Sequence, residues 1–246
     1  MRILLANHEV LLQGLTMTLA LTLCVLVIAT VFAALLAAGL MARHPVLRRL
    51  AQVISEVMRD IPLFVTVMMV YFVAPSFGIG LDPFGATLVG LGAWGAANGS
   101  TIIRAGILAV PAGQREASAA LGLRPWQVLR LVILPQALRP ILPPYLGLTT
   151  QLVQATSVGA LIGVRELLRT GQIVMERATV MEGGLSPFLL YGVILLIYFA
   201  ICSALSALSR RLERRLGRHE NHTMAATPQA ETSQPGALAR LRIARS

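Results

Sequence analysis

Five long stretches of this 246-residue chain contain no Asp, Glu, Lys or Arg, and this pattern limits the possible folds more than any other feature. Each stretch can supply the roughly 20 apolar residues that a helix needs to cross a bilayer. Backbone N–H and C=O groups in lipid must be paired within their own segment, so helices are expected and open sheets are excluded. The sequence therefore predicts an all-α polytopic membrane protein with about five transmembrane helices. The charge-free stretches are Val10–Ala42, Ile61–Leu81, Pro83–Ile103, Pro140–Val164 and Gly183–Ser209.

Composition supports this prediction, and the placement of the arginines predicts the orientation of the chain across the membrane. Hydrophobic residues make up 56% of the chain, the mean hydropathy is +0.72, and only 13% of residues are charged. All basic residues are Arg, and with the N-terminus outside, 17 of the 21 lie on the inner side. Cytoplasmic loops carry the excess of positive charge, so an N-out/C-in topology is expected. The net charge of +10 then reflects topology and a basic tail, and no nucleic-acid partner is expected.

The chain is expected to form one membrane domain with short flanking segments. Residues 1–13 are predicted to be an external amphipathic lead, and residues 14–209 the transmembrane domain. Residues 210–246 are predicted to be a basic cytoplasmic tail that is largely disordered after residue 220.

No residue pattern for catalysis or metal binding is present in the sequence. The chain has no GxxxxGK[ST] motif and no Lys, so the phosphate-binding lysine of a P-loop is impossible and the chain cannot be an ATPase. Cys24 and Cys202 lie in apolar stretches, and the four His are not at metal-binding spacing. We therefore expect no catalytic residue, no metal site and no cofactor bound by this chain.

Two polar stripes run along the third and fourth predicted spans at helical spacing. In lipid such residues either line a substrate path or hold helices together by interhelical hydrogen bonds, and the sequence leaves both interpretations open. If the stripes face each other, a transport path between the third and fourth spans is the economical explanation. The candidate path residues are Trp94, Asn98, Thr101 and Arg104 in the third span and Gln154, Thr156 and Ser157 in the fourth.

Glycine and proline give further local predictions in the same two spans. Gly95 and Gly99 have the small-xxx-small spacing that lets helices pack closely, and Gly159 and Gly163 repeat it. The dense prolines of Pro140–Pro144 are expected to bend or delay the fourth helix.

The segment from residue 113 to 135 is polar and rich in Arg, although it lies between apolar runs. A short helix, Gln114–Leu121, is expected to end at Gly122, because glycine readily adopts the left-handed conformation that closes a helix. Arg124-Pro125 then turns the chain, a second helix begins at Trp126, and Pro135 ends it. Taken alone, this hairpin is either an interfacial element resting on lipid or a docking surface for a cytoplasmic partner.

The hairpin resembles the EAA loop of ABC importer permeases in the run Glu116-Ala117-Ser118, then Gly122, then Ile133-Leu134-Pro135. The similarity extends in order from about Gly14 to Gln172. Five stretches are similar to the branch of the family that imports polar amino acids. They are Gly14–Thr22, Arg59–Phe64, Arg104–Ala117, Leu134–Pro144 and Ala155–Leu167.

This resemblance implies a type I ABC importer permease fold with a cytoplasmic coupling helix, located in the bacterial inner membrane. It implies three kinds of partner besides the lipid bilayer: ATP-binding cassette subunits, which bind the ATP; a second permease subunit, identical or paralogous; and a periplasmic substrate-binding protein. The residues implied to couple to the ATPase are Glu116, Ala117, Ala120, Leu121, Gly122, Arg124 and Pro135.

The sequence also departs from the pattern of that branch. Asn98 and Thr101 stand where Tyr and Glu are usual, and Gln154-Ala155 stands where Lys and Asp or Asn are common. An altered substrate, a passive half of a heterodimer, or recognition by the separate binding protein would each account for these changes. The alternative functions are a permease for another small solute, an ion-coupled secondary transporter and a non-transporting membrane scaffold.

Overall fold

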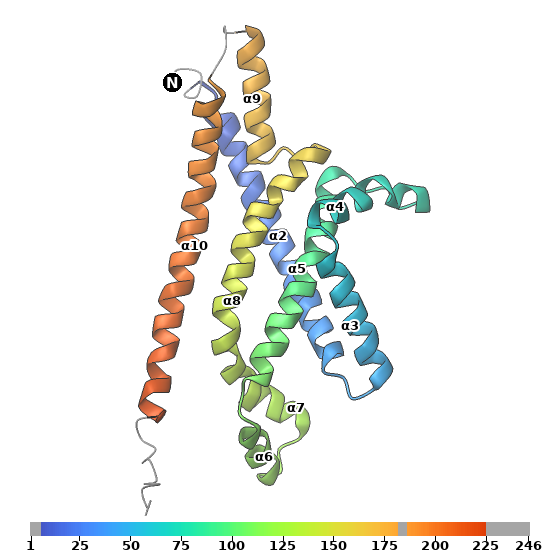
Figure 1. Ribbon diagram of the computed structural model, residues 1–246, viewed down its shortest axis with the longest axis vertical. Coiled ribbons are helices and arrows are strands. Elements are labelled where there is room, and N and C mark those ends of the chain that lie inside the picture. The colour runs from blue at the N-terminus through green and yellow to red at the C-terminus, as the bar shows by residue number, and fades with distance from the viewer. Residues whose placement is uncertain (1–5, 182–185, 225–246) are drawn as a thin grey trace, which may run out of the picture. The chain divides into compact units, whose positions relative to one another are not determined.

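The computed structural model describes residues 6–181 and 186–224, and every regular element in that part of the chain is a helix (Figure 1). The all-α class is therefore confirmed. The chain divides into two compact units, Met1–Leu212 and Glu213–Ser246, and the packing below concerns the first unit. The α-helices are α2 (His8–Leu40), α3 (Pro45–Asp60), α4 (Leu63–Phe72), α5 (Pro83–Leu108), α6 (Ala112–Ala120), α7 (Pro125–Gln127), α8 (Leu134–Ala155), α9 (Leu167–Met181) and α10 (Pro187–Met224). The remaining elements are the 3₁₀ helices η1 (Ala74–Phe77) and η3 (Thr156–Ile162) and the π-helix η2 (Val128–Ile133).

Three helical segments in the described residues are long and apolar enough to cross a membrane: His8–Leu40, Pro125–Ile162 and Pro187–Arg215. The second predicted span is interrupted, since α4 has only 10 residues. The third predicted span, α5, has 26 residues and is long enough to cross a membrane. It is rich in Gly and polar residues, so its mean hydropathy is lower than that of the three apolar segments. The total of five spans and the N-out/C-in orientation therefore stay predictions.

The helix boundaries differ from the predicted segment boundaries at both ends of the chain. Helix α2 begins at His8, so residues 8–13 are the first turns of the first long helix. Helix α10 continues through residue 210 to Met224. The three-part division of the chain stays a prediction, and residues 225–246 of the predicted tail lie outside the described residues.

Helix α3 is an amphipathic helix separate from α4, because Ile61-Pro62 breaks the helical backbone between them. Its buried residues are Ala51 and Ser55, and Ser55 Oγ lies 3.5 Å from Ser100 Oγ of α5. In the structure α3 is a helix of its own that packs against α2 and α5.

Helix α5 lies at the centre of the packing, in contact with α2, α3, α4 and α8. A Cβ atom built on Gly95 would lie 2.9 Å from Ala29 Cβ, and one on Gly99 would lie 2.9 Å from Ala33 Cβ. The close approach predicted from the spacing of these two glycines is confirmed. In the second pair, a Cβ built on Gly159 would lie 3.1 Å from Thr87 Oγ1 of α5, so the close approach is confirmed for this glycine. The prediction is wrong for Gly163, which has open space around it and a φ of +98° that ends a 3₁₀ helix.

The prolines of α8 do not delay the helix, which runs without interruption from Leu134 to Ala155. Proline lacks an N–H, so each one leaves a backbone carbonyl of the preceding turn without its helical donor. Two side chains donate to carbonyls in this region: Ser209 Oγ to the Pro143 oxygen at 3.2 Å and Gln136 Nε2 to the Val132 oxygen at 3.0 Å. The residues four positions after Pro143 and Val132 are Gly147 and Gln136, which keep their N–H groups, so these bonds add to the contacts of α8 and do not replace donors that proline removes.

The α2–α5 contact can be tested with a glycine pair matched in chemistry. Gly95→Ala should lower the thermal unfolding midpoint of the purified protein, because the added methyl group meets the Ala29 methyl at 2.9 Å and overpacking costs about 1–3 kcal/mol. Gly147→Ala, in α8, adds the same methyl group in open space and is the control. Equal midpoints for the two variants would contradict the close contact.

Candidate functional site

The end of α6 is closed by a double hydrogen-bond pattern centred on Gly122. Gly122 N donates to the Ala119 oxygen at 2.9 Å, and Leu123 N donates to the Ser118 oxygen at 3.2 Å. Gly122 has a φ of +77°, and nothing lies within 4 Å of where its Cβ would be. The glycine is required here because the Schellman motif needs a left-handed residue after the helix. Within this chain, Gly122 is needed for its left-handed backbone conformation, because no neighbouring atom lies close enough to exclude a side chain.

The second half of the hairpin is capped and continuous with α8. The Gln127 side chain accepts from Arg124 N at 2.8 Å, and Pro125 occupies the first helical position, where its missing N–H costs nothing. α7, η2 and α8 then follow one another without a non-helical residue. The predicted helix–turn–helix is confirmed, but Pro135 does not end the second helix; it lies in the first turn of α8.

The hairpin is held to the rest of the chain by a few contacts at its base. Arg115 Nη2 donates to the Ile107 oxygen at 3.4 Å, and Gln136 Nε2 donates to Gln114 Oε1 at 3.4 Å. Ser118 is buried and donates to the Gln114 oxygen. These bonds fix α6 against the end of α5 and the start of α8.

All seven residues predicted to couple to the ATPase are exposed on this hairpin. Leu121 is 81% exposed and Trp126 57%, which is high for large apolar side chains. In the second half of the hairpin, Ile133 is buried in the core below, whereas Leu129 points outward and is 47% exposed. The hairpin therefore presents an uncovered surface with apolar and charged groups, which we call the hairpin surface.

On α5, the polar stripe residues satisfy their hydrogen bonds within their own helix. Asn98 Nδ2 donates to the Trp94 oxygen at 2.9 Å, and Thr101 Oγ1 donates to the Asn98 oxygen at 2.8 Å. Trp94, Asn98 and Thr101 are half-buried, and Arg104 is exposed. Because these side-chain hydrogen bonds of Asn98 and Thr101 stay within α5, they do not join α5 to a neighbouring helix.

On α8, Gln154 points away from α5, so at this residue the two stripes do not face each other within one chain. Leu152 packs against Gly95 of α5, and Gln154 lies two residues further, about 200° around the helix axis. Gln154 Nε2 instead lies 3.6 Å from Cys202 Sγ of α10. Thr156 and Ser157 are in η3, where their hydroxyls donate to carbonyls three residues earlier. The α5–α8 contact itself is apolar and closely packed.

A buried carboxylate, Glu166, was missed as an organising residue by sequence reasoning. Glu166 is fully buried and accepts from Leu168 N at 2.9 Å and Arg169 N at 2.8 Å, which caps α9. It also accepts from the hydroxyl of Tyr198, in α10, at 2.7 Å. An acidic residue just before a helical apolar pattern was the available signal.

The surroundings of Glu166 join three helices. Leu167 N donates to Thr18 Oγ1 of α2 at 3.1 Å, so α2, α9 and α10 meet at this carboxylate. Burial raises the pKa of Glu166, and the hydrogen bonds from Leu168, Tyr198 and Arg169 lower it by less. In the described residues, no group of three or more His, Cys, Asp or Glu could hold a metal ion.

In the part of the chain that the structure describes, three long apolar helical segments and an exposed polar hairpin are the architecture of a polytopic membrane protein. The family model described as "Binding-protein-dependent transport system inner membrane component" matches residues 29–218. This chain belongs to that family.

Characterised relatives agree with this assignment. The chain is 37% identical over 180 residues to the glutamine transport system permease protein GlnP of Escherichia coli (strain K12), covering 72% of this chain and 77% of that one. It is 30% identical over 214 residues to the probable amino-acid ABC transporter permease protein YckA of Bacillus subtilis (strain 168), covering 87% and 92%.

A solved structure described as an amino acid ABC transporter with histidines matches with a TM-score of 0.78 and 30% identity, over 86% of this chain and 96% of that one. The MetNI methionine ABC transporter matches in fold with a TM-score of 0.70 at 21% identity. The predicted permease fold is therefore confirmed. The chain is a translocation subunit, and ATP hydrolysis belongs to a separate subunit of such transporters.

The conformation of Gly122 gives a first prediction for the site. Gly122→Ala should speed amide hydrogen exchange in residues 112–123, because an L-residue in the left-handed region costs about 1–2 kcal/mol. Gly113→Ala, where a Cβ also has open space but φ is not positive, should leave exchange unchanged and is the matched control. Protection in Gly122→Ala equal to that of the wild type would contradict this assignment.

The raised pKa of Glu166 gives a second prediction. A folded-state pKa above the unfolded one means that the folded protein binds the proton more tightly, so stability falls as pH rises from about 4.3 through the raised pKa. The unfolding midpoint of the wild type minus that of Glu166→Gln should therefore decrease over this range in detergent. The control is Glu176→Gln, which removes one negative charge at an exposed position of α9, the helix that Glu166 caps. Parallel profiles for the wild type and Glu166→Gln would contradict the prediction.

Proposed function

We propose that this chain is the permease subunit of an ATP-driven importer of polar amino acids in the bacterial inner membrane. The observation that carries the proposal is the similarity to GlnP, 37% identical over 180 residues. Relatives named for L-cystine and glutamate/aspartate transport, at 33% and 32% identity, support an amino-acid substrate class. The predicted inner location of most arginines supports an orientation with the hairpin surface in the cytoplasm.

In this proposal the ATP-binding subunits dock on the hairpin surface. The surface is exposed and carries Leu121 and Trp126, which offer apolar area to a partner groove. Movement of the docked partner reaches the membrane through α8, because α7, η2 and α8 form one continuous helical segment. The helix is stiff enough to transmit a displacement that a flexible loop would absorb.

The substrate path is proposed to lie between two permease subunits and not between α5 and α8 of one chain. The glycines of α5 close the α5–α8 contact, with a Cβ on Gly106 meeting Ile141 and one on Gly95 meeting Leu152. Trp94, Asn98 and Thr101 lie beside that contact and remain partly accessible. A second permease subunit, identical or paralogous, would complete the wall, and a periplasmic binding protein would deliver the substrate from outside.

The second candidate is a permease for another small solute, which the neutral residues Asn98, Thr101 and Gln154 favour. Uptake of radiolabelled glutamine, glutamate, histidine and a neutral sugar by cells expressing the complete importer distinguishes the two. ATP-dependent uptake of one or more amino acids, absent when this chain is deleted and restored by its expression, supports the proposal. Restoration of sugar uptake alone would support the second candidate.

The docking step is tested by changing the hairpin surface without changing the membrane helices. Glu116→Lys and Gly122→Asp should reduce uptake by about tenfold or more while the protein still reaches the membrane, because they reverse or add a charge on the exposed docking residues. Glu176→Lys makes the same charge reversal at an exposed position on α9 and should retain uptake. Normal uptake by both hairpin variants at normal expression would exclude this docking surface.

A further inference from the structure

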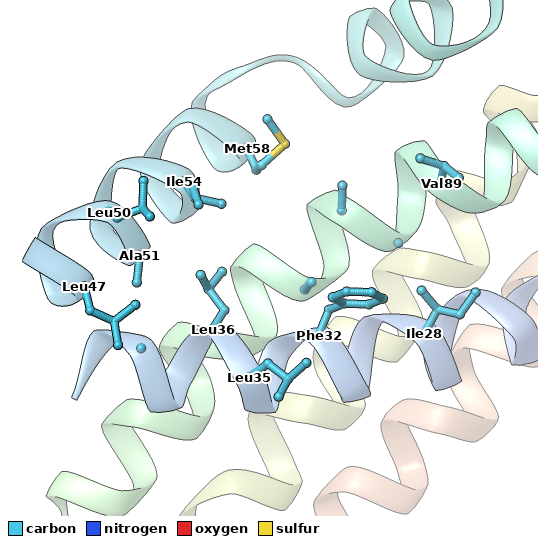
Figure 2. A pocket seen from close by; sticks show the side chains of 14 residues that line it. Ile28, Phe32, Leu35, Leu36, Leu47, Leu50, Ala51, Ile54, Met58 and Val89 are labelled. Atoms are coloured by element: carbon cyan, nitrogen blue, oxygen red, sulfur yellow. The ribbon is translucent and has the colours of Figure 1, made fainter. Parts of the chain in front are cut away.

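A hollow of about 580 Å³ lies between α2, α3 and α5, within the size range of ligand pockets, about 300–1,000 Å³ (Figure 2). All fourteen residues that line it are apolar. Helix α5 contributes small residues, among them Gly92 and Ala96, whereas α2 contributes the large side chains of Phe32 and Leu35. These two side chains are 56% and 63% exposed, so the hollow opens to the surroundings of the chain.

The length of the hollow corresponds to one leaflet of a bilayer. Its lining residues extend from Ile28 to Gly39 on α2 and from Leu47 to Met58 on α3, a separation of 11 residues on each helix. At 1.5 Å per residue each separation is about 16 Å. The hydrocarbon core of a bilayer is about 30 Å thick, so the hollow spans about half of it.

One end of the hollow carries three cationic side chains. Arg43 lies in the turn between α2 and α3, and Arg48 and Arg49 lie in the first turns of α3, next to the lining residues Leu47 and Leu50. All three arginines are exposed, and none of their guanidinium groups makes a hydrogen bond or ion pair with another residue in the described ranges. Guanidinium groups bind phosphate oxygens with paired, charge-assisted hydrogen bonds.

We propose that this hollow is a binding site for one anionic phospholipid of the leaflet that faces the arginines. An acyl chain lies along the groove between α2 and α3, where Figure 2 shows Leu36, Leu47, Leu50 and Ile54 pointing into the same space. The phosphate lies against the arginines at the end of the groove. An apolar channel of one-leaflet length with cations at one end matches the shape and charge of such a lipid.

A second copy of this chain fits the same groove less well. Two copies in one bilayer share their orientation, so a two-fold interface at this face would bring the same residues of both copies together at the same depth. Arg43, Arg48 and Arg49 of each copy would then face those of the other, and like charges at an interface are unfavourable. The lipid instead neutralises them.

The test uses a phosphatidylglycerol probe with a photoactivatable group in its acyl chain. The full chain, purified with its partner subunits, is placed in phosphatidylethanolamine nanodiscs that contain the probe, and the cross-linked peptides are identified by mass spectrometry. The proposal expects labelling of peptides from α2, α3 and α5. Arg48→Gln/Arg49→Gln should reduce this labelling by about tenfold, since each arginine near an anionic headgroup contributes to binding.

Matched variants separate the site from general lipid contact. Arg210→Gln/Arg211→Gln removes two exposed arginines from α10 and should leave the labelling unchanged. Ala93→Phe fills the hollow and should abolish labelling, whereas Ala34→Phe adds the same ring to an exposed position of α2 outside it. Equal labelling in both arginine variants, or cross-links from the hollow to a second permease chain in place of the lipid, would overturn the proposal.

Discussion

The close packing of α5 is the constraint on which the other helices depend. Its glycines are distributed so that each neighbour meets a position without a side chain: Gly90 faces Val67 of α4, Gly95 faces Ala29 of α2, and Gly106 faces Ile141 of α8. A helix can contact this many neighbours at short range only where its own side chains are small. The same composition explains why α5 is less apolar than the three long segments, since much of its surface is covered by protein.

Hydrogen bonding in the bundle follows from the same arrangement. Most Ser and Thr hydroxyls in the helices donate to carbonyls three or four residues earlier in their own helix, as Thr22 and Thr149 do. Interhelical bonds occur at a few points, including Tyr145 to Thr30 at 2.9 Å and Tyr198 to Glu166 at 2.7 Å. Helices joined mainly by apolar contact can shift past one another without leaving polar groups unpaired, which a transport subunit requires.

The sequence was most informative where a local rule decides the structure. Gly122 and Pro125 specify a helix end and a helix start through their own φ preferences, so the hairpin could be predicted residue by residue. It was least informative where a distant contact decides. Glu166 is buried because Tyr198, 32 residues further along the chain, donates to it, and no local pattern contains that partner. The proline-rich part of α8 is a continuous helix, which the local rule for proline does not predict.

The rigidity of the hairpin determines where a conformational change can occur. Its turn is closed by two hydrogen bonds at Gly122, and its second helix continues into α8, so the hairpin cannot absorb the movement of a docked partner. α8 itself is bounded by a π-helix, η2, at one end and a 3₁₀ helix, η3, at the other. Segments with a different hydrogen-bond spacing often mark hinges, but η2 belongs to the hairpin's own second helix. A displacement received at the hairpin would therefore move η2 and α8 together and be accommodated at η3. The far end, η3, is where Thr156 and Ser157 lie, next to Gln154, so the same movement would change the part of the chain proposed to contact substrate.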